Sequence, residues 1–156
     1  MPAKDHRELR VYQLAFETAV RIQQLTKAFP QEERYSLTDQ IRRSSRSVCA
    51  NIAEAWRKRR YPKNFVSKLS DTDSEAAETR VWLDFALHFG YLSADNYEEL
   101  ADRYNHICSQ LSLMMDEPEK WMPRKTATTQ VTTQPSLRAL FAKQSPARTA
   151  MCAQES

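Results

Sequence analysis

The chain has 156 residues, of which 28% are charged and 41% are hydrophobic, and its formal net charge is +3. This length fits one soluble domain with a hydrophobic core and a short remainder, so a second fold is not required. Glycine occurs once, whereas strand-rich folds and phosphate-cradling loops both depend on glycine at tight turns. The composition therefore favours helices and argues against a nucleotide-binding fold.

The cysteines and the apolar runs bear on the cellular compartment. Cys49, Cys108 and Cys152 lie far apart and lack the paired spacing of a zinc site or a thioredoxin-like site. No apolar run approaches the roughly 18 residues of a membrane span, and the first residues are already polar and charged. The sequence predicts a cytoplasmic protein in a reducing compartment, with no membrane partner and no cofactor.

The first amphipathic segment predicts a helix over residues 7–28, closed by Pro30. Tyr12, Phe16 and Ala19 form a second apolar row beside the core-facing one, so this helix should meet two neighbours, which hints at an oligomer. The core-facing row consists of Val11, Leu14, Ala15, Thr18, Ile22 and Leu25.

A second helix is predicted from a capping-box variant at Ser36-Leu37-Thr38-Asp39 to about Lys58. Many small residues, among them Ser44 and Ala50, should let a neighbouring backbone approach closely and place this helix at the centre. Its core-facing row consists of Leu37, Ile41, Ser44, Val48, Ile52 and Ala55.

A third helix should begin at Pro62 and end at Phe89, where Gly90 can take the left-handed conformation that stops a helix. Its inward row is Phe65, Leu69, Thr72, Ala76, Thr79, Leu83 and Ala86. A second apolar surface near its end consists of Val81, Trp82, Phe85 and Phe89.

The fourth helix should be capped by Ser93 and run to Asp116. Its apolar row is Tyr97, Leu100, Tyr104, Ile107, Leu111 and Met114. Four long helices with short connections predict an all-α, antiparallel up-and-down four-helix bundle over residues 1–122. Residues 123–156 are rich in Thr, Gln and Pro without periodicity, which is typical of a disordered tail.

The strongest candidate for function is a basic set on and after the second helix, in the stretch from Arg42 to Lys63, whose one acidic residue is Glu54. The set consists of Arg42, Arg43, Arg46, Arg57, Lys58, Arg59, Arg60 and Lys63. On a helix continued to Arg60, Arg42, Arg46, Arg57 and Arg60 share one side and form a stripe suited to a phosphate backbone. Tyr61 and Phe65 lie beside it and could stack on exposed bases.

Two interpretations of this basic set stay open. In one, it binds nucleic acid, and an oligomer gathers several copies so that weak phosphate contacts act together. In the other, the cations form a solvated face that pairs with the acidic third helix of the same subunit or of a neighbour, or with a partner protein, and nucleic acid plays no role.

Other polar residues carry weaker signals. Glu54 is placed to pair with Lys58 four residues on, and Asn51, near the core boundary, could hydrogen-bond across the bundle and fix its register. His88 and His106 each follow an aspartate by four residues, but the Glu-x-x-His motifs of a di-iron bundle are missing from the sequence. No catalytic triad can be assigned, so we expect neither a metal site nor enzymatic activity.

Several strings of residues resemble the four-helix bundle proteins of intervening sequences in bacterial 23S rRNA genes. They are Leu9-x-Val-Tyr-x-x-Ala, Gln40-Ile-Arg-Arg, Ala50-Asn-Ile-Ala-Glu and Glu78-Thr-Arg-Val-Trp, within a match over roughly residues 6–122. Many relatives have Gly where this chain has Ser36 or Ala55.

The resemblance implies a homopentameric ring without enzymatic activity that binds RNA or DNA. The family is also similar to accessory proteins of diversity-generating retroelements, which implies a reverse transcriptase as a further possible partner. Arg42, Arg43 and Arg46 fall in the matched basic motif, and Asn51 and Glu54 fall in the second motif as structural or inter-helix residues.

Overall fold

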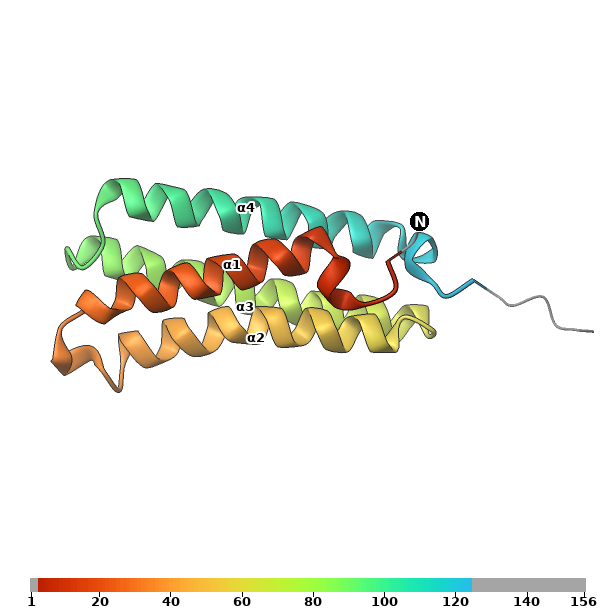
Figure 1. The fold of residues 1–156 in the computed structure, drawn as a ribbon, viewed down its shortest axis with the longest axis horizontal. Coiled ribbons are helices and arrows are strands. Elements are labelled where there is room, and N and C mark those ends of the chain that lie inside the picture. Colours follow the sequence, from red (N-terminus) through yellow and green to blue (C-terminus); the bar gives the residue numbers. More distant parts are fainter. Residues whose placement is uncertain (1–2, 125–156) are drawn as a thin grey trace, which may run out of the picture. The chain divides into compact units, whose positions relative to one another are not determined.

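Each predicted helix is present in the computed structural model, which describes residues 3–124. The helices are α1 (Arg10–Leu25), α2 (Leu37–Lys58), α3 (Pro62–His88) and α4 (Ala94–Asp116), and no strand occurs among the described residues. Helices that follow one another in the chain run antiparallel, as Figure 1 shows. The prediction of an all-α up-and-down bundle is confirmed, whereas the predicted disordered tail lies outside the described residues from residue 125 onward.

Different connections between helices lie at the two ends of the bundle (Figure 1). At one end, which we call the turn end, the short α2–α3 turn lies near the start of α1 and the finish of α4. At the other, the connector end, residues 26–36 lead from α1 into α2, and a second short turn joins α3 to α4. This division matters below because the cations of α2 lie toward both ends.

The core consists of the predicted apolar rows. All seven inward residues of α3 and all six of α2 are buried, and Phe65 and Tyr104 are fully inaccessible to solvent. On α1 and α4 the rows are buried apart from Leu14, Leu25 and Tyr97, which are half-buried. The helical periodicity of the sequence therefore identifies the core correctly.

Small residues bring α2 and α3 together in the interior. The buried hydroxyls of Ser44 and Thr79 share a hydrogen bond of 2.8 Å between the two helices. A buried hydroxyl needs such a partner, and here the Thr79 hydroxyl donates to the Ser44 hydroxyl oxygen. The predicted close approach of a neighbour along α2 is thus made by α3.

The first helix is shorter than predicted at both ends. Asp5 caps a separate 3-10 turn, His6–Glu8, and Leu9 is extended and buried before α1 begins at Arg10. At the other end the Thr26 hydroxyl donates to the Ile22 carbonyl at 2.7 Å, and the chain tightens into a 3-10 turn, Thr26–Ala28. Residues 3–9 form what we call the N-terminal strap.

The predicted capping box at the start of α2 is wrong. Ser36 makes no side-chain cap, and the carboxylate of Glu33 instead accepts from the Leu37 N–H at 3.2 Å and from the Ser36 hydroxyl. The Tyr91 hydroxyl donates to the other oxygen of Glu33 at 3.2 Å. The hydrogen bond from Ser36, followed by those from Leu37 and Tyr91, holds the pKa of Glu33 below its usual value.

The α3–α4 turn follows the prediction. Gly90 has φ of +76°, the Gly90 N–H donates to the Leu87 carbonyl at 3.0 Å, and the Tyr91 N–H donates to the Ala86 carbonyl at 2.9 Å. These two bonds satisfy the last free carbonyls of α3. Ser93 then caps α4, since its hydroxyl accepts from the backbone N–H of residue 96 at 3.2 Å.

Replacing Gly90 with Ala should lower the free energy of unfolding by about 1 kcal/mol, because a side chain at positive φ crowds its own backbone. A Cβ at this position meets no atom within 4 Å, so the cost comes from backbone strain alone. Urea denaturation measures it, with Gly90→Asn as the control, because Asn tolerates this conformation and should lose less. An Ala variant as stable as the wild type would contradict the assignment.

Glu33 should make stability depend on pH in the acidic range. Since its folded pKa is lowered, its contribution is complete above the unfolded value near 4.5 and is lost as the pH falls through the folded value. The difference in unfolding free energy between wild type and Glu33→Gln should therefore shrink on acidification, as urea titrations at several pH values would show. Glu32→Gln is the control, and a difference that stays constant with pH would refute the role of Glu33.

Candidate nucleic-acid interface

The predicted basic set separates into two groups along α2. Arg42, Arg43 and Arg46 lie toward the connector end, and Arg57 follows Arg46 by eleven residues, which is about 16 Å along the helix axis. The second group comprises Arg57, Lys58, Arg59, Arg60 and Lys63 at the turn end. The two groups have different surroundings.

Two arginines of the first group hold α2 to α1. Arg42 Nε donates to the Thr26 hydroxyl at 2.8 Å, and a guanidinium N–H of Arg46 donates to the Gln23 side-chain oxygen at 2.8 Å. Arg42 is half-buried and Arg46 is exposed. Part of the hydrogen-bonding capacity of both side chains therefore serves the packing of the bundle.

Arg43 lies on a different side of α2 from Arg42. Its guanidinium is 3.6 Å from the Asp39 carboxylate, one helical turn earlier. It also lines a polar depression between α2 and α3 together with Glu75 and Glu78. Consecutive residues of the matched Arg-Arg motif thus face opposite surroundings, Arg42 toward α1 and Arg43 toward acidic groups.

The cations at the turn end are the most available for binding. Arg57, Arg60 and Lys63 are exposed, and within residues 3–124 none of them forms an ion pair. Lys58 is the exception, since its ammonium is 2.8 Å from Glu54. We call Arg57, Arg59, Arg60 and Lys63 the turn cluster.

Arg59 is the positioned member of the turn cluster. Its guanidinium carbon lies 3.9 Å from the centre of the Trp56 ring, and one N–H donates to the Trp56 carbonyl at 2.7 Å. Burial, and then repulsion from Arg57, lowers the pKa of Arg59. Repulsion between neighbours of like charge indicates a local excess of positive charge that an anion would relieve.

The predicted stripe is incomplete because α2 ends too early. The helix ends at Lys58 with Arg59 as its cap, so Arg60 lies in the turn and does not continue the helical side of Arg42, Arg46 and Arg57. The turn is short because Pro62 already occupies the first turn of α3.

Of the two aromatic candidates for stacking, one is accessible. Phe65 is fully buried in the core, so its proposed contact with bases is wrong. Tyr61 is 61% exposed between Arg60 and Lys63, and makes no side-chain hydrogen bond within residues 3–124. An aromatic ring open to solvent among cations is the arrangement by which proteins stack on unpaired bases.

Glu54 contacts α3, whereas the side chain of Asn51 bonds within α2. Glu54 forms the predicted pair with Lys58 and a second with Lys68 of α3 at 3.0 Å, and these hydrogen bonds, first that from Lys58, lower its pKa. The side-chain amide of Asn51 donates to the Ser47 hydroxyl at 3.2 Å, within the same helix. The predicted hydrogen bond of Asn51 across the bundle is therefore not formed, and Glu54 makes the inter-helix contact instead.

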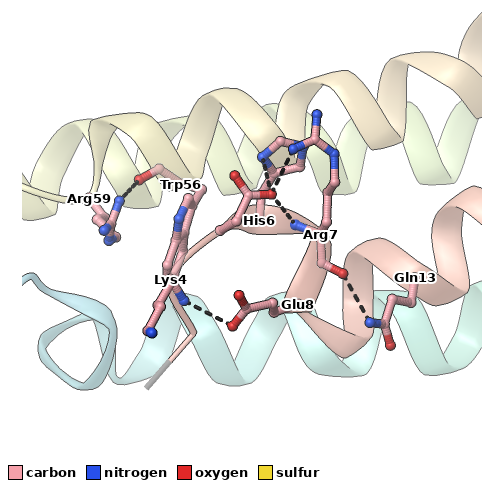
Figure 2. Close-up of polar contacts among 8 residues, drawn as sticks. Lys4, His6, Arg7, Glu8, Gln13, Trp56 and Arg59 are labelled. Atoms are coloured by element: carbon pink, nitrogen blue, oxygen red, sulfur yellow. Dashed lines mark hydrogen bonds and ion pairs between the residues drawn. The ribbon is translucent and has the colours of Figure 1, made fainter. Parts of the chain in front are cut away.

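The strap adds basic residues that the sequence pattern did not predict at this site. Its 3-10 turn contacts both α1 and α2, and the His6 ring packs edge-on against Tyr12 with centroids 4.8 Å apart. Figure 2 shows Lys4 and Arg7 of the strap in the same region as Arg59. Arg7 pairs with Asp5 at 3.2 Å, whereas the Lys4 ammonium has no ion pair among the described residues. Only the folded chain brings them to the turn end.

Two groups of apolar side chains remain on the surface. On α1, Phe16 is 52% and Val20 43% exposed, and we call this pair the α1 apolar row. On α3, Val81, Phe85 and Phe89 are about half exposed, with the Phe85 and Phe89 rings stacked at 5.7 Å, and we call these the α3 apolar row. Tyr12, Ala19 and Trp82 of the predicted second surfaces instead pack against the core.

Residues suited to metal binding or nucleophilic chemistry are dispersed. Among residues 3–124, no three His, Cys, Asp or Glu side chains gather in a way that could hold a metal ion. Burial raises the pKa of Cys49 and of Cys108 to about 11, so both thiols are protonated at neutral pH. None of the helices in this part of the chain combines the length and apolar character that crossing a membrane requires.

Comparison with known proteins agrees with this architecture. The model of the 23S rRNA-intervening sequence protein family matches residues 7–113. The chain is also similar to a protein of unknown function from the S23 ribosomal protein family of Bacteroides thetaiotaomicron, known from a crystal structure. The identity is 31% and the TM-score 0.62, over 68% of this chain and 95% of that one. No curated protein matches. The chain belongs to the 23S rRNA-intervening sequence protein family.

Proposed function

We propose that the protein is a non-enzymatic, homo-oligomeric nucleic-acid-binding bundle of the cytoplasm, with RNA as the favoured ligand. The observation that carries this proposal is the turn cluster, whose cations flank the exposed Tyr61 in the sequence and form no ion pairs within residues 3–124. Guanidinium and ammonium groups neutralise phosphates, and the ring supplies a stacking surface.

Self-association is the second part of the proposal. The α1 and α3 apolar rows expose large side chains that a second copy would cover. A pentamer is the state that the family resemblance implies. Five copies of the turn cluster in one particle would raise the effective concentration of phosphate contacts that are individually weak.

Replacing Arg57, Arg60 and Lys63 together with Gln should weaken binding of a single-stranded RNA oligonucleotide by at least about tenfold. The slope of log K against log salt concentration should fall by about 2, because roughly three phosphate contacts are lost. Fluorescence anisotropy at several salt concentrations measures both quantities.

The matched control removes three other exposed positive charges that form no ion pair within residues 3–124, by Arg10→Gln, Arg80→Gln and Arg124→Gln. If net charge alone governs binding, the two triple variants will weaken it equally, and the turn cluster is then not the site. Wild-type protein that binds no oligonucleotide at low salt would refute the nucleic-acid function altogether.

Assembly should depend on the α3 apolar row. Phe85→Glu places a charge on a side chain that is 45% exposed, so the subunit should fold normally but fail to assemble. Native mass spectrometry should show five subunits for the wild type and one for the variant, with circular dichroism as the check on folding. Leu113→Glu, on an exposed apolar residue of α4, is the control and should leave assembly intact.

A protein-interaction adaptor is the alternative, and one observation favours it. Arg43 already lies beside Asp39 and the acidic residues of α3, and Lys68 pairs with Glu54, so basic and acidic helices do meet in this fold. If the protein is an adaptor, neutralising the turn cluster should impair capture of a protein partner, such as a reverse transcriptase. The wild-type protein should then bind no nucleic acid.

A further inference from the structure

A second basic site lies at the connector end, away from the turn cluster. Where α1 leads into α2, the surface is hollowed by a depression of about 260 Å³. The polar and charged residues that line it are Thr26, Lys27, Gln31, Arg34, Thr38 and Arg42. They come from two segments, residues 26–36 and the first turns of α2, which meet at the connector end in Figure 1.

The residues that line this depression carry positive charges and no negative charge. Lys27, Arg34 and Arg42 line it, and no carboxylate does. Among residues 3–124, none of these three cations forms an ion pair, whereas Arg43, next in the sequence to Arg42, is 3.6 Å from Asp39. The Arg34 guanidinium also lies over the Tyr35 ring, 5.3 Å from its centre. Three cations around one depression without an anion favour the binding of an anion there.

Arg42 is held in place for such a role. Its Nε donates to the Thr26 hydroxyl at 2.8 Å, and that hydroxyl itself donates to the Ile22 carbonyl at 2.7 Å. This chain of bonds fixes the half-buried guanidinium, while its terminal N–H groups form no hydrogen bond within the described residues. A fixed guanidinium with free terminal donors suits two oxygens of one oxyanion.

Thr38 supplies an independent indication. The residue is 6% exposed, and its hydroxyl is buried without a hydrogen-bond partner among residues 3–124. Native structures rarely leave a buried hydroxyl unsatisfied, and a bound water or ion can supply the missing partner. Thr38 lines the depression and its hydroxyl oxygen is covered, so rotation of the side chain is required before this hydroxyl donates to a bound anion.

We propose that this depression binds a phosphate group. Three cations, a hydroxyl and the amide of Gln31 offer more donors than a planar carboxylate can use, and they match the several oxygens and the negative charge of a phosphate group. The phosphate can come from free phosphate or from the backbone of a nucleic-acid strand. The inference goes beyond the proposed function and does not depend on the turn cluster.

Isothermal titration of the full-length protein with inorganic phosphate at constant ionic strength tests the site. Arg42→Gln should weaken binding by about tenfold through loss of its charge-assisted hydrogen bonds. Arg43→Gln, which changes the neighbouring residue and the same charge, should leave the affinity unchanged. Equal weakening by both variants, or no saturable heat in the wild type, would overturn the proposal.

Thr38→Val guards against a folding artefact, because Arg42 also helps to join α1 to α2. Valine has the shape of threonine without the unsatisfied hydroxyl, so the melting temperature should not fall, while phosphate affinity should drop a few-fold. Unchanged affinity in this variant would count against the site.

Oligonucleotide binding by the same variants distinguishes the source of the phosphate. If Arg42→Gln weakens both phosphate and RNA binding, and Arg43→Gln neither, the site takes a phosphate of the strand. If it weakens the phosphate titration alone, the site takes free phosphate. The triple variant of the turn cluster should retain phosphate binding in either case. A result that refutes RNA binding at the turn cluster would therefore leave the phosphate site untouched, and the two failures can be told apart.

Discussion

The hydrogen bond between Ser44 and Thr79 fixes how α2 lies against α3, and much of the molecule depends on that register. Both hydroxyls are buried, so sliding one helix along the other would break this bond and leave each hydroxyl only a carbonyl of its own helix, Glu75 at 2.9 Å for Thr79 and Ile41 at 3.4 Å for Ser44. In this register Glu54 meets Lys68, and the side of α2 that bears Arg42 turns toward α1. The contact that joins the two helices in this register involves no charge.

Helical periodicity predicted most of the fold, because the burial of a side chain on an amphipathic helix follows from its angle around the axis. The inward rows of α2 and α3 and the stop at Gly90 needed no tertiary information. The position at which α2 starts was predicted correctly, but its capping group was not, since the cap comes from Glu33, whose carboxylate is held by Tyr91 from 58 residues away. The sequence around Glu33 does not indicate that Tyr91 is its partner.

The candidate site was harder to predict, because a count of charges does not say what each side chain touches. The sequence grouped eight cations, and in the folded chain Arg42 and Arg46 contact α1, Arg43 lies beside Asp39, and Lys58 pairs with Glu54. Lys4 joins the turn end only through the folded strap. The angle of a residue around the helix axis predicts the direction in which its side chain points. The partner with which that side chain pairs depends on residues distant in the chain.

The shortness of the α2–α3 turn has a thermodynamic consequence for binding. A basic segment on a mobile loop must give up backbone freedom each time it closes on a ligand, at roughly 1–2 kcal/mol per residue. Residues 59–61 are held between two long helices, and Arg59 is stacked on Trp56, so this entropy is lost once, when the chain folds. Preorganisation of this kind allows a few cations to bind as well as a larger number on a flexible tail.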